Sequence, residues 1–175
     1  MNTNALKTFA KAARIQLVDA VGKQILYWGF SQKGEVENAP LETQGGYVHR
    51  GEVYNDATVL PKWQRLKEKI TANKEAFKDV AEEAAYTWFN RLVAIKVLEE
   101  NGFIEPFLQF AEGAQSPIAL QQAKVGNHTV THPTLKANLQ KALLNSDEEK
   151  AFAILLINFC NQHPMLNQVF GRVND

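Results

Sequence analysis

The sequence predicts a mainly α fold, a single-domain helical bundle of residues 1–175 around a central long helix at about 74–101, with an irregular or small β segment at about 29–60. Apolar residues recur at spacings of three and four over most of the chain, which is the period of an amphipathic helix. Glycine and proline gather between residues 29 and 60, where that period breaks. A chain of 175 residues is also the size of one domain, which buries roughly 70% of its unfolded surface.

The first predicted helix runs from about Asn4 to Trp28, with Thr3 as its N-cap. Its apolar positions fall in one stripe at 100° per residue, and they are Leu6, Phe9, Ala10, Ala13, Leu17, Ala20 and Val21. In the segment that follows, the run Tyr47-Val48-His49 is either an extended piece or one arm of a small hairpin.

The helical period resumes after Leu60-Pro61, because proline is tolerated in a first turn, where its missing N–H is not needed. Asn73 is the predicted cap of the central helix, and Gly102 suits the left-handed turn after its end. Because one neighbour cannot cover two opposed apolar faces, we expect helices packed on both sides of it, with Trp88 and Phe89 in the core. The two faces are Ala81, Ala84, Trp88, Leu92 and Ile95, and Tyr86, Phe89, Val93 and Val97.

Shorter helices are predicted for the remainder of the chain. Three proline-containing pairs are start signals, namely Glu105-Pro106, Ser116-Pro117 and His132-Pro133. Ser146 and Glu149 have the spacing of a capping box, which predicts a final apolar helix from Phe152 to Cys160 that stops before Pro164.

The charges exclude a generally basic protein, because 19 basic and 19 acidic side chains give a formal net charge of zero. Any contact with nucleic acid must therefore be local. Two helix edges each carry three cations at one-turn spacing, and Arg50 lies in a segment that mixes aromatic and basic groups with Tyr47, His49 and Tyr54. The alternative is that these charges form solvated faces. The predicted DNA contacts are Lys7, Lys11, Arg14, Lys62, Arg65, Lys69 and Arg50.

No catalytic residue and no metal site is predicted. His128 and His132 have the spacing of two ligands on one helical turn, but Pro133 places them across a loop and a helix start. Cys160 and His163 are a nominal nucleophile and base, yet a thiol in an apolar helix is usually buried. A single cysteine excludes an internal disulfide, and no apolar run is long enough to span a membrane, so we expect a cytoplasmic protein.

One run of the central helix carries a family resemblance. Residues 85–91 read Ala-Tyr-Thr-Trp-Phe-Asn-Arg, and an aliphatic stretch then leads to Glu100-Asn101-Gly102-Phe103. This pattern resembles the signature helix of the PglX family, the adenine-specific DNA methyltransferases of BREX phage-defence systems. The opening residues 1–10, and the run from Leu155 to Gln162 followed by Phe170, resemble that family more weakly and in the same order. The signature residues are Tyr86, Trp88, Phe89, Asn90, Arg91, Asn101 and Gly102.

The resemblance implies a non-catalytic N-terminal helical domain of a much longer enzyme. Family members carry an F-x-G-x-G type loop for S-adenosylmethionine and an N-P-P-Y type motif for the adenine, and this sequence has neither. We therefore expect an excised domain or a natural truncation, with no cofactor of its own. Its implied partners are the methyltransferase domain of the parent enzyme, DNA and other phage-defence subunits.

The sequence is compatible with two roles for the domain. The domain helps to enclose DNA, or it is an adaptor that docks partner proteins and does not touch DNA, for which alternating blocks of charge are equally suited. For Asn90 and Arg91, a local hydrogen-bond bracket to a neighbouring segment is preferred over a direct contact with DNA or a partner.

Overall fold

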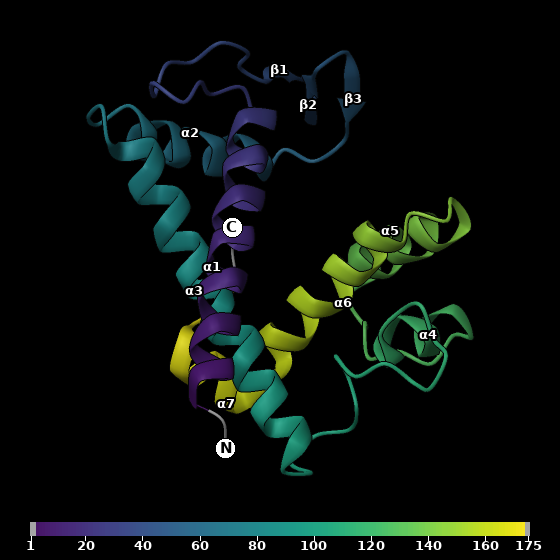
Figure 1. Cartoon of the computed structure of the whole chain (residues 1–175). Helices are drawn as coiled ribbons and strands as arrows, with labels where there is room; N and C mark the ends of the chain where they lie inside the picture. Colours follow the sequence, from purple (N-terminus) through teal and green to yellow (C-terminus); the bar gives the residue numbers. More distant parts are fainter. Residues whose placement is uncertain (1–2, 174–175) are drawn as a thin grey trace. The chain divides into compact units, whose positions relative to one another are not determined.

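The computed structural model describes residues 3–173 and is mainly α with one small sheet, as predicted (Figure 1). The elements in chain order are α1 (Thr3–Tyr27), β1 (Leu41–Thr43), β2 (Gly46–His49), β3 (Glu52–Tyr54), α2 (Val59–Ile70), α3 (Ala76–Glu100), α4 (Ile118–Lys124), α5 (Pro133–Leu144), α6 (Glu148–Gln162) and α7 (Pro164–Phe170). The chain divides into two compact units, Met1–Phe89 and Asn90–Asp175, and the boundary falls inside α3. Each unit has its own apolar core. The single domain over residues 1–175 stays a prediction.

Unit 1 packs α1, α2 and the first half of α3 around a small aromatic-rich core. Figure 1 shows α2 crossing the C-terminal end of α1. At this crossing the Trp63 indole N–H donates to the carbonyl oxygen of Trp28 at 2.8 Å, and the Trp63 ring stacks on Phe30 with ring centroids 5.3 Å apart. The indole therefore satisfies its one donor while its ring remains in the core. The buried members of this core are Ile25, Phe30, Trp63, Ile70 and Ala81.

The segment predicted as irregular or β forms an antiparallel meander in the order β1-β2-β3. Tyr47-Val48-His49 lies in its central strand, β2, and pairs on both sides. The turn between α1 and the sheet requires glycine at position 29, which has a φ of 89°. A Cβ atom at Gly29 would lie 1.7 Å from the carbonyl oxygen of Asn38, so a side chain would collide with the backbone that this turn brings close.

In unit 2, α4, α5 and α6 pack around an aliphatic core, and α7 contacts α6. The loop after α3 is organised by Glu99, whose side chain is fully buried and whose carboxylate accepts hydrogen bonds from the backbone N–H groups of Phe107 and Leu108. Gly102 has a φ of 69° at the end of α3, as predicted. The buried members of the core are Leu120, Ala123, Val130, Leu139, Ala142, Ala151 and Leu155.

Some predicted helix starts are confirmed and others are wrong. Pro61 lies in the first turn of α2, and α5 begins at Pro133, as predicted. The start predicted at Glu105-Pro106 is wrong, because residues 101–117 form a loop without a helix. Thr3 is already helical and is therefore not the residue before α1.

The capping box of Ser146 and Glu149 is also wrong. Asp147 is the N-cap of α6, and its carboxylate accepts from the N–H of Lys150 at 3.1 Å. Ser146 takes a φ of 56° in the tight turn after α5, which removes it from the capping position. α6 extends to Gln162, and Pro164 then opens α7.

The prediction that α3 is buried on two opposed faces is wrong. Tyr86, Val93 and Val97 on the second face are 64%, 41% and 52% exposed, and Phe89 on that face is only partly buried. Trp88 is partly buried as well. An apolar spacing identifies residues that share a helix face, but whether another element covers that face depends on distant parts of the chain. The buried apolar side chains of α3 are Ala76, Ala81, Ala85, Ile95 and Leu98.

Candidate functional site

The cationic edge of α2 lies in solvent, beside the helix face that Trp63 and Ile70 bury. Lys62 and Arg65 are exposed, and neither has a carboxylate within ion-pair distance among residues 3–173. Lys69 lies 3.7 Å from a carboxylate oxygen of Glu83. The predicted edge therefore exists, and two of its three cations are free to meet an anion.

The cationic edge of α1 also has two exposed cations and a third that is paired with a carboxylate of α3. Lys7 and Lys11 are exposed, and the third cation, Arg14, donates to Glu82 of α3 at 3.0 Å. Because Glu82 and Glu83 are adjacent, the two edges approach each other where their last cations pair with α3. Both ion pairs are solvent-exposed, so each contributes at most about 1 kcal/mol to stability. Their main effect is to neutralise one cation of each edge.

The third predicted group, around Arg50, closes the end of α1. The guanidinium of Arg50 donates to the carbonyl oxygens of Tyr27 at 2.9 Å and Leu26 at 3.1 Å, and it lies 5.2 Å from the centre of the Tyr27 ring. The carbonyls at the end of a helix have no partners within the helix, and a cation is favourable there. Arg50 thus has a structural role, although its side chain stays exposed.

The aromatic neighbours of Arg50 also face one another. His49 is buried, its Nε2 lies 2.8 Å from the Tyr27 carbonyl oxygen, and its ring stacks on Trp28. Tyr47 stacks on Tyr54 with centroids 4.9 Å apart. Burial raises the pKa of the Tyr47 hydroxyl, and a hydrogen bond to Glu52 raises the pKa of Tyr54. Each of these rings therefore has at least one face covered by another aromatic ring.

The family signature fixes one internal contact in unit 2. Arg91 is buried, its Nη2 donates to the carbonyl oxygen of Phe170 at 3.0 Å, and its guanidinium lies 5.8 Å from the centre of the Phe170 ring. This hydrogen bond joins Arg91 to a segment 79 residues later in the chain, whereas the bracket expected for Arg91 was local. Asn101, in contrast, is exposed and donates to the Val97 carbonyl oxygen at the end of α3.

Besides the hydrogen bond from Arg91 to Phe170, a second contact holds the segment after α7, and this contact was not predicted. Asn161 of α6 binds the backbone of Val173 twice, since its amide group donates to the Val173 carbonyl oxygen at 3.0 Å and its oxygen accepts from the Val173 N–H at 2.6 Å. The signal available in the sequence was the weaker family match, which contains both Asn161 and Phe170. Arg91 and Asn161 together hold residues 170–173, a segment we call the clamped segment.

The histidine and cysteine candidates lie in separate settings. Within residues 3–173, no group of three or more histidine, cysteine, aspartate or glutamate residues is placed to hold a metal ion. His163 caps α7, because its Nδ1 accepts from the N–H of Leu166. Cys160 is buried, and that burial raises the pKa of its thiol, although the nearby Arg91 charge acts in the opposite direction.

Cys160 is therefore expected to be unreactive in the folded chain. At pH 8, we expect a thiol reagent to label Cys160 at least about 100-fold more slowly in the native protein than in denaturant, because labelling requires exposure of the thiolate. A raised pKa in the folded state also means that the thiol's contribution to stability declines once the pH exceeds about 8.5, the ordinary thiol pKa. Native labelling at the denatured rate would contradict the buried thiol.

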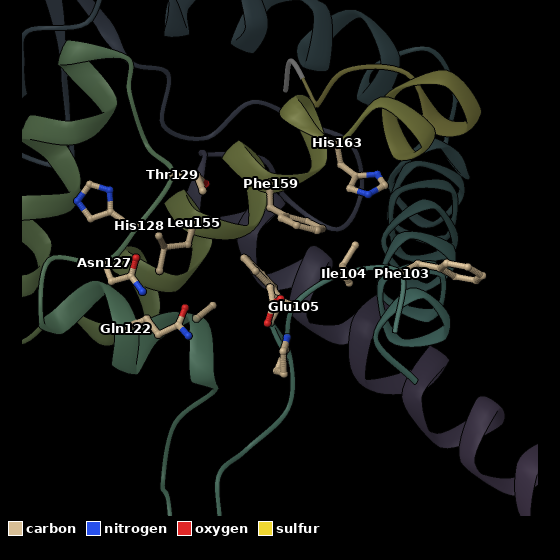
Figure 2. Close-up of a pocket in the computed structure, with 13 residues that line it drawn as sticks. Phe103, Ile104, Glu105, Gln122, Asn127, His128, Thr129, Leu155, Phe159 and His163 are labelled. Atoms are coloured by element: carbon tan, nitrogen blue, oxygen red, sulfur yellow. The ribbon is translucent and has the colours of Figure 1, made fainter. Parts of the chain in front are cut away.

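An open cavity of about 400 Å³ lies in unit 2 between α4, α6 and the loop after α3 (Figure 2). Ile104, Leu155 and Phe159 contribute its apolar surface, and Gln122 and His128 contribute polar groups. The Nδ1 atom of His128 is buried and has no hydrogen-bond partner among the described residues. The sequence did not predict this cavity, because its walls come from segments far apart in the chain, at 103–107, 119–129 and 155–163.

These surfaces and this fold define a mainly α module whose exposed features are cationic helix edges and apolar hollows. Within residues 3–173, no helix has the length and apolar character needed to cross a bilayer. No protein-family model matches the chain.

Curated proteins with known names do match the chain. It is 30% identical over 184 residues to the adenine-specific methyltransferase BrxX of Escherichia coli O9:H4 (strain HS), a match that covers 100% of this chain and 15% of that protein. It is 27% identical over 199 residues to the adenine-specific methyltransferase PglX of Lacticaseibacillus casei (strain Zhang), covering 100% of this chain and 16% of the relative. The resemblance to the PglX family is thereby confirmed over the whole chain. The chain spans about one sixth of the length of these relatives.

Proposed function

We propose that this chain is the non-catalytic N-terminal helical part of a BREX adenine-specific DNA methyltransferase, and that it helps the enzyme to enclose DNA. The observation that carries the proposal is the match of the entire chain to a small part of two adenine-specific methyltransferases. Methyl transfer to adenine N6, and the S-adenosylmethionine that supplies the methyl group, belong to other parts of that enzyme.

The glycines of this chain do not fit a cofactor loop. A Rossmann-like methyltransferase domain binds its cofactor at a glycine turn between a strand and a helix. The only Gly-Gly pair, Gly45-Gly46, lies where the turn after β1 enters β2, and Gly46 is the first residue of β2. A Cβ atom at Gly46 would lie 1.9 Å from the Tyr54 carbonyl oxygen, so this glycine serves the close approach of β3. This placement supports a role in binding or assembly.

The α2 edge is the best-supported contact with DNA. Lys62 and Arg65 are one turn apart, both exposed, and neither is paired within the described part of the chain. Their helix is held by Trp63 and Ile70, so the cations project from a supported element. Cations in this arrangement bind phosphates without reading bases, which suits a part that embraces DNA while the recognition of sequence occurs elsewhere.

The double variant Lys62→Glu/Arg65→Glu is expected to bind duplex DNA at least about tenfold more weakly than the unmodified chain at low salt. Loss of two phosphate contacts also lowers the slope of log affinity against log salt by about 2. Fluorescence anisotropy with a labelled duplex, measured at low and moderate salt, gives both quantities.

A matched control is Lys136→Glu/Lys141→Glu on α5, which changes the net charge equally. Both lysines are exposed, and neither makes an ion pair within residues 3–173. If both double variants weaken binding to the same extent, binding responds only to the change in overall charge, and α2 is not the contact.

The second candidate function is an adaptor that docks partner proteins without touching DNA. Its support is the zero net charge together with the ion pairs that neutralise Arg14 and Lys69. Absence of DNA binding even at low salt, together with co-purification of a phage-defence subunit, would favour the adaptor over the DNA contact.

A further inference from the structure

An apolar groove of about 190 Å³ runs between the C-terminal half of α3 and α7. Its most exposed side chains are Val97, Met165 and Val169, which are 52%, 54% and 67% exposed. Three large apolar side chains converging on one hollow form a contiguous patch, in contrast to single exposed residues that need no explanation. The groove is lined by Val97 and Leu98 of α3 and by Met165, Leu166, Val169 and Phe170 of α7.

The chemistry of the groove selects its occupant. Among residues 3–173, no charged or hydrogen-bonding side chain lines it, so the described groove offers nothing to a phosphate backbone. Its volume is that of one or two large apolar side chains, which is what a ridge of a helix or strand presents. Methionine adapts its shape to such a partner, and Met165 lies at the rim of the groove.

The hydrogen bonds from Arg91 and Asn161 hold the clamped segment, residues 170–173, beside this groove. Phe170 lines the groove and gives its carbonyl oxygen to Arg91, while Val173 is held three residues further on by Asn161. Both clamping side chains lie within elements of unit 2, so the clamped segment has one fixed course. Val173, the last residue that the structure describes, is therefore held near the end of α7.

We propose that this groove is the docking site for an apolar ridge from the methyltransferase part of the same polypeptide. This inference rests on the proposed function, in which the matched stretch is only about one sixth of the enzyme. Most of the enzyme thus lies outside the stretch and is attached to it covalently. Covalent attachment gives a neighbouring ridge a high effective concentration at the groove, which favours it over a separate protein.

Thiol labelling tests the proposal with one exposed cysteine at a time. Val169→Cys reports on the groove, and Val53→Cys in β3, which is 70% exposed against 67% for Val169, is the matched control. The same substitutions are made in this chain and at the aligned positions of the purified full-length Escherichia coli BrxX. Labelled peptides are quantified by mass spectrometry, which separates the introduced cysteine from native ones.

The expected result is that the groove cysteine reacts at least tenfold more slowly in full-length BrxX than in this chain, while the control changes by less than about threefold, as surfaces that remain in solvent do. Equal rates at the groove in both proteins overturn the proposal. Labelling that slows in this chain as its own concentration is raised means that a second copy occupies the groove, and this also overturns it. Failure of DNA binding by the α2 edge would leave this labelling result unchanged, so the two proposals fail separately.

Discussion

Replacing Phe30 by alanine is expected to lower the free energy of unfolding of unit 1 by about 3–5 kcal/mol. Phe30 is 1% exposed and stacks on Trp63, so its removal loses the transfer free energy of the ring and leaves a cavity beside the crossing of α1 and α2. Trp63 donates to the Trp28 carbonyl oxygen and cannot move into that cavity without breaking the hydrogen bond. Urea denaturation followed by circular dichroism measures the loss.

Phe9→Ala is the matched control, because Phe9 is an exposed phenylalanine of α1. Its replacement is expected to change stability by less than about 0.5 kcal/mol. The same titrations examine the domain organisation. If the chain unfolds in one transition, Phe30→Ala shifts the whole curve and supports a single cooperative domain; if unit 1 unfolds separately, only one of two transitions moves. Equal losses for Phe30 and Phe9 would contradict the core described for unit 1.

Replacing Glu99 by alanine is expected to destabilise unit 2 by about 2–5 kcal/mol, since two backbone N–H groups in a partly buried loop lose their acceptor. The carboxylate is fully buried at the end of α3 and is joined by Lys96 at 3.4 Å. Without it, the loop that continues from Phe107 loses its attachment to α3. Thermal denaturation gives the loss, and hydrogen exchange at Phe107 and Leu108 locates it.

Glu99→Gln separates the hydrogen bonds from the charge. A single oxygen, Oε1, accepts from both N–H groups, and the glutamine amide retains an oxygen in that place. We therefore expect a loss of about 1 kcal/mol, well below that of Glu99→Ala, because bonds to a charged acceptor are stronger than bonds to a neutral one. If glutamine and alanine destabilise equally, the two hydrogen bonds are not the reason for the burial of Glu99.

The residues of the signature helix show which features could be predicted from the sequence and which could not. The match to the PglX family was found from residues 85–103, and the comparisons with BrxX and PglX confirm it. A local bracket was expected for Arg91, whereas its partner Phe170 lies 79 residues later in the chain and could not be inferred from the sequence. Asn161 was missed because an asparagine near a helix end has no pattern that names its partner. A hydrogen bond between distant segments leaves no periodic trace in either one.

The DNA contacts remain predictions that the structure has sharpened. Cation spacing along α1 and α2 was read correctly as helix edges, since spacing on one helix is a local property. Pairing of Arg14 with Glu82 and of Lys69 with Glu83 depends on how α1 and α2 lie against α3. Arg50 was grouped with DNA contacts from composition alone, whereas the fold brings it to the carbonyl end of α1.

The sequence by itself determined the mainly α class, the long helix at α3 and the family resemblance, because periodicity, turn residues and short motifs are local and survive without knowledge of distant contacts. Only the tertiary structure decided that one face of α3 is left open, that Glu99 holds the loop after it, and that an apolar groove forms beside α7. Each of these depends on which remote segment covers a surface or supplies a partner, and an amphipathic pattern is the same whether the covering element is present or absent.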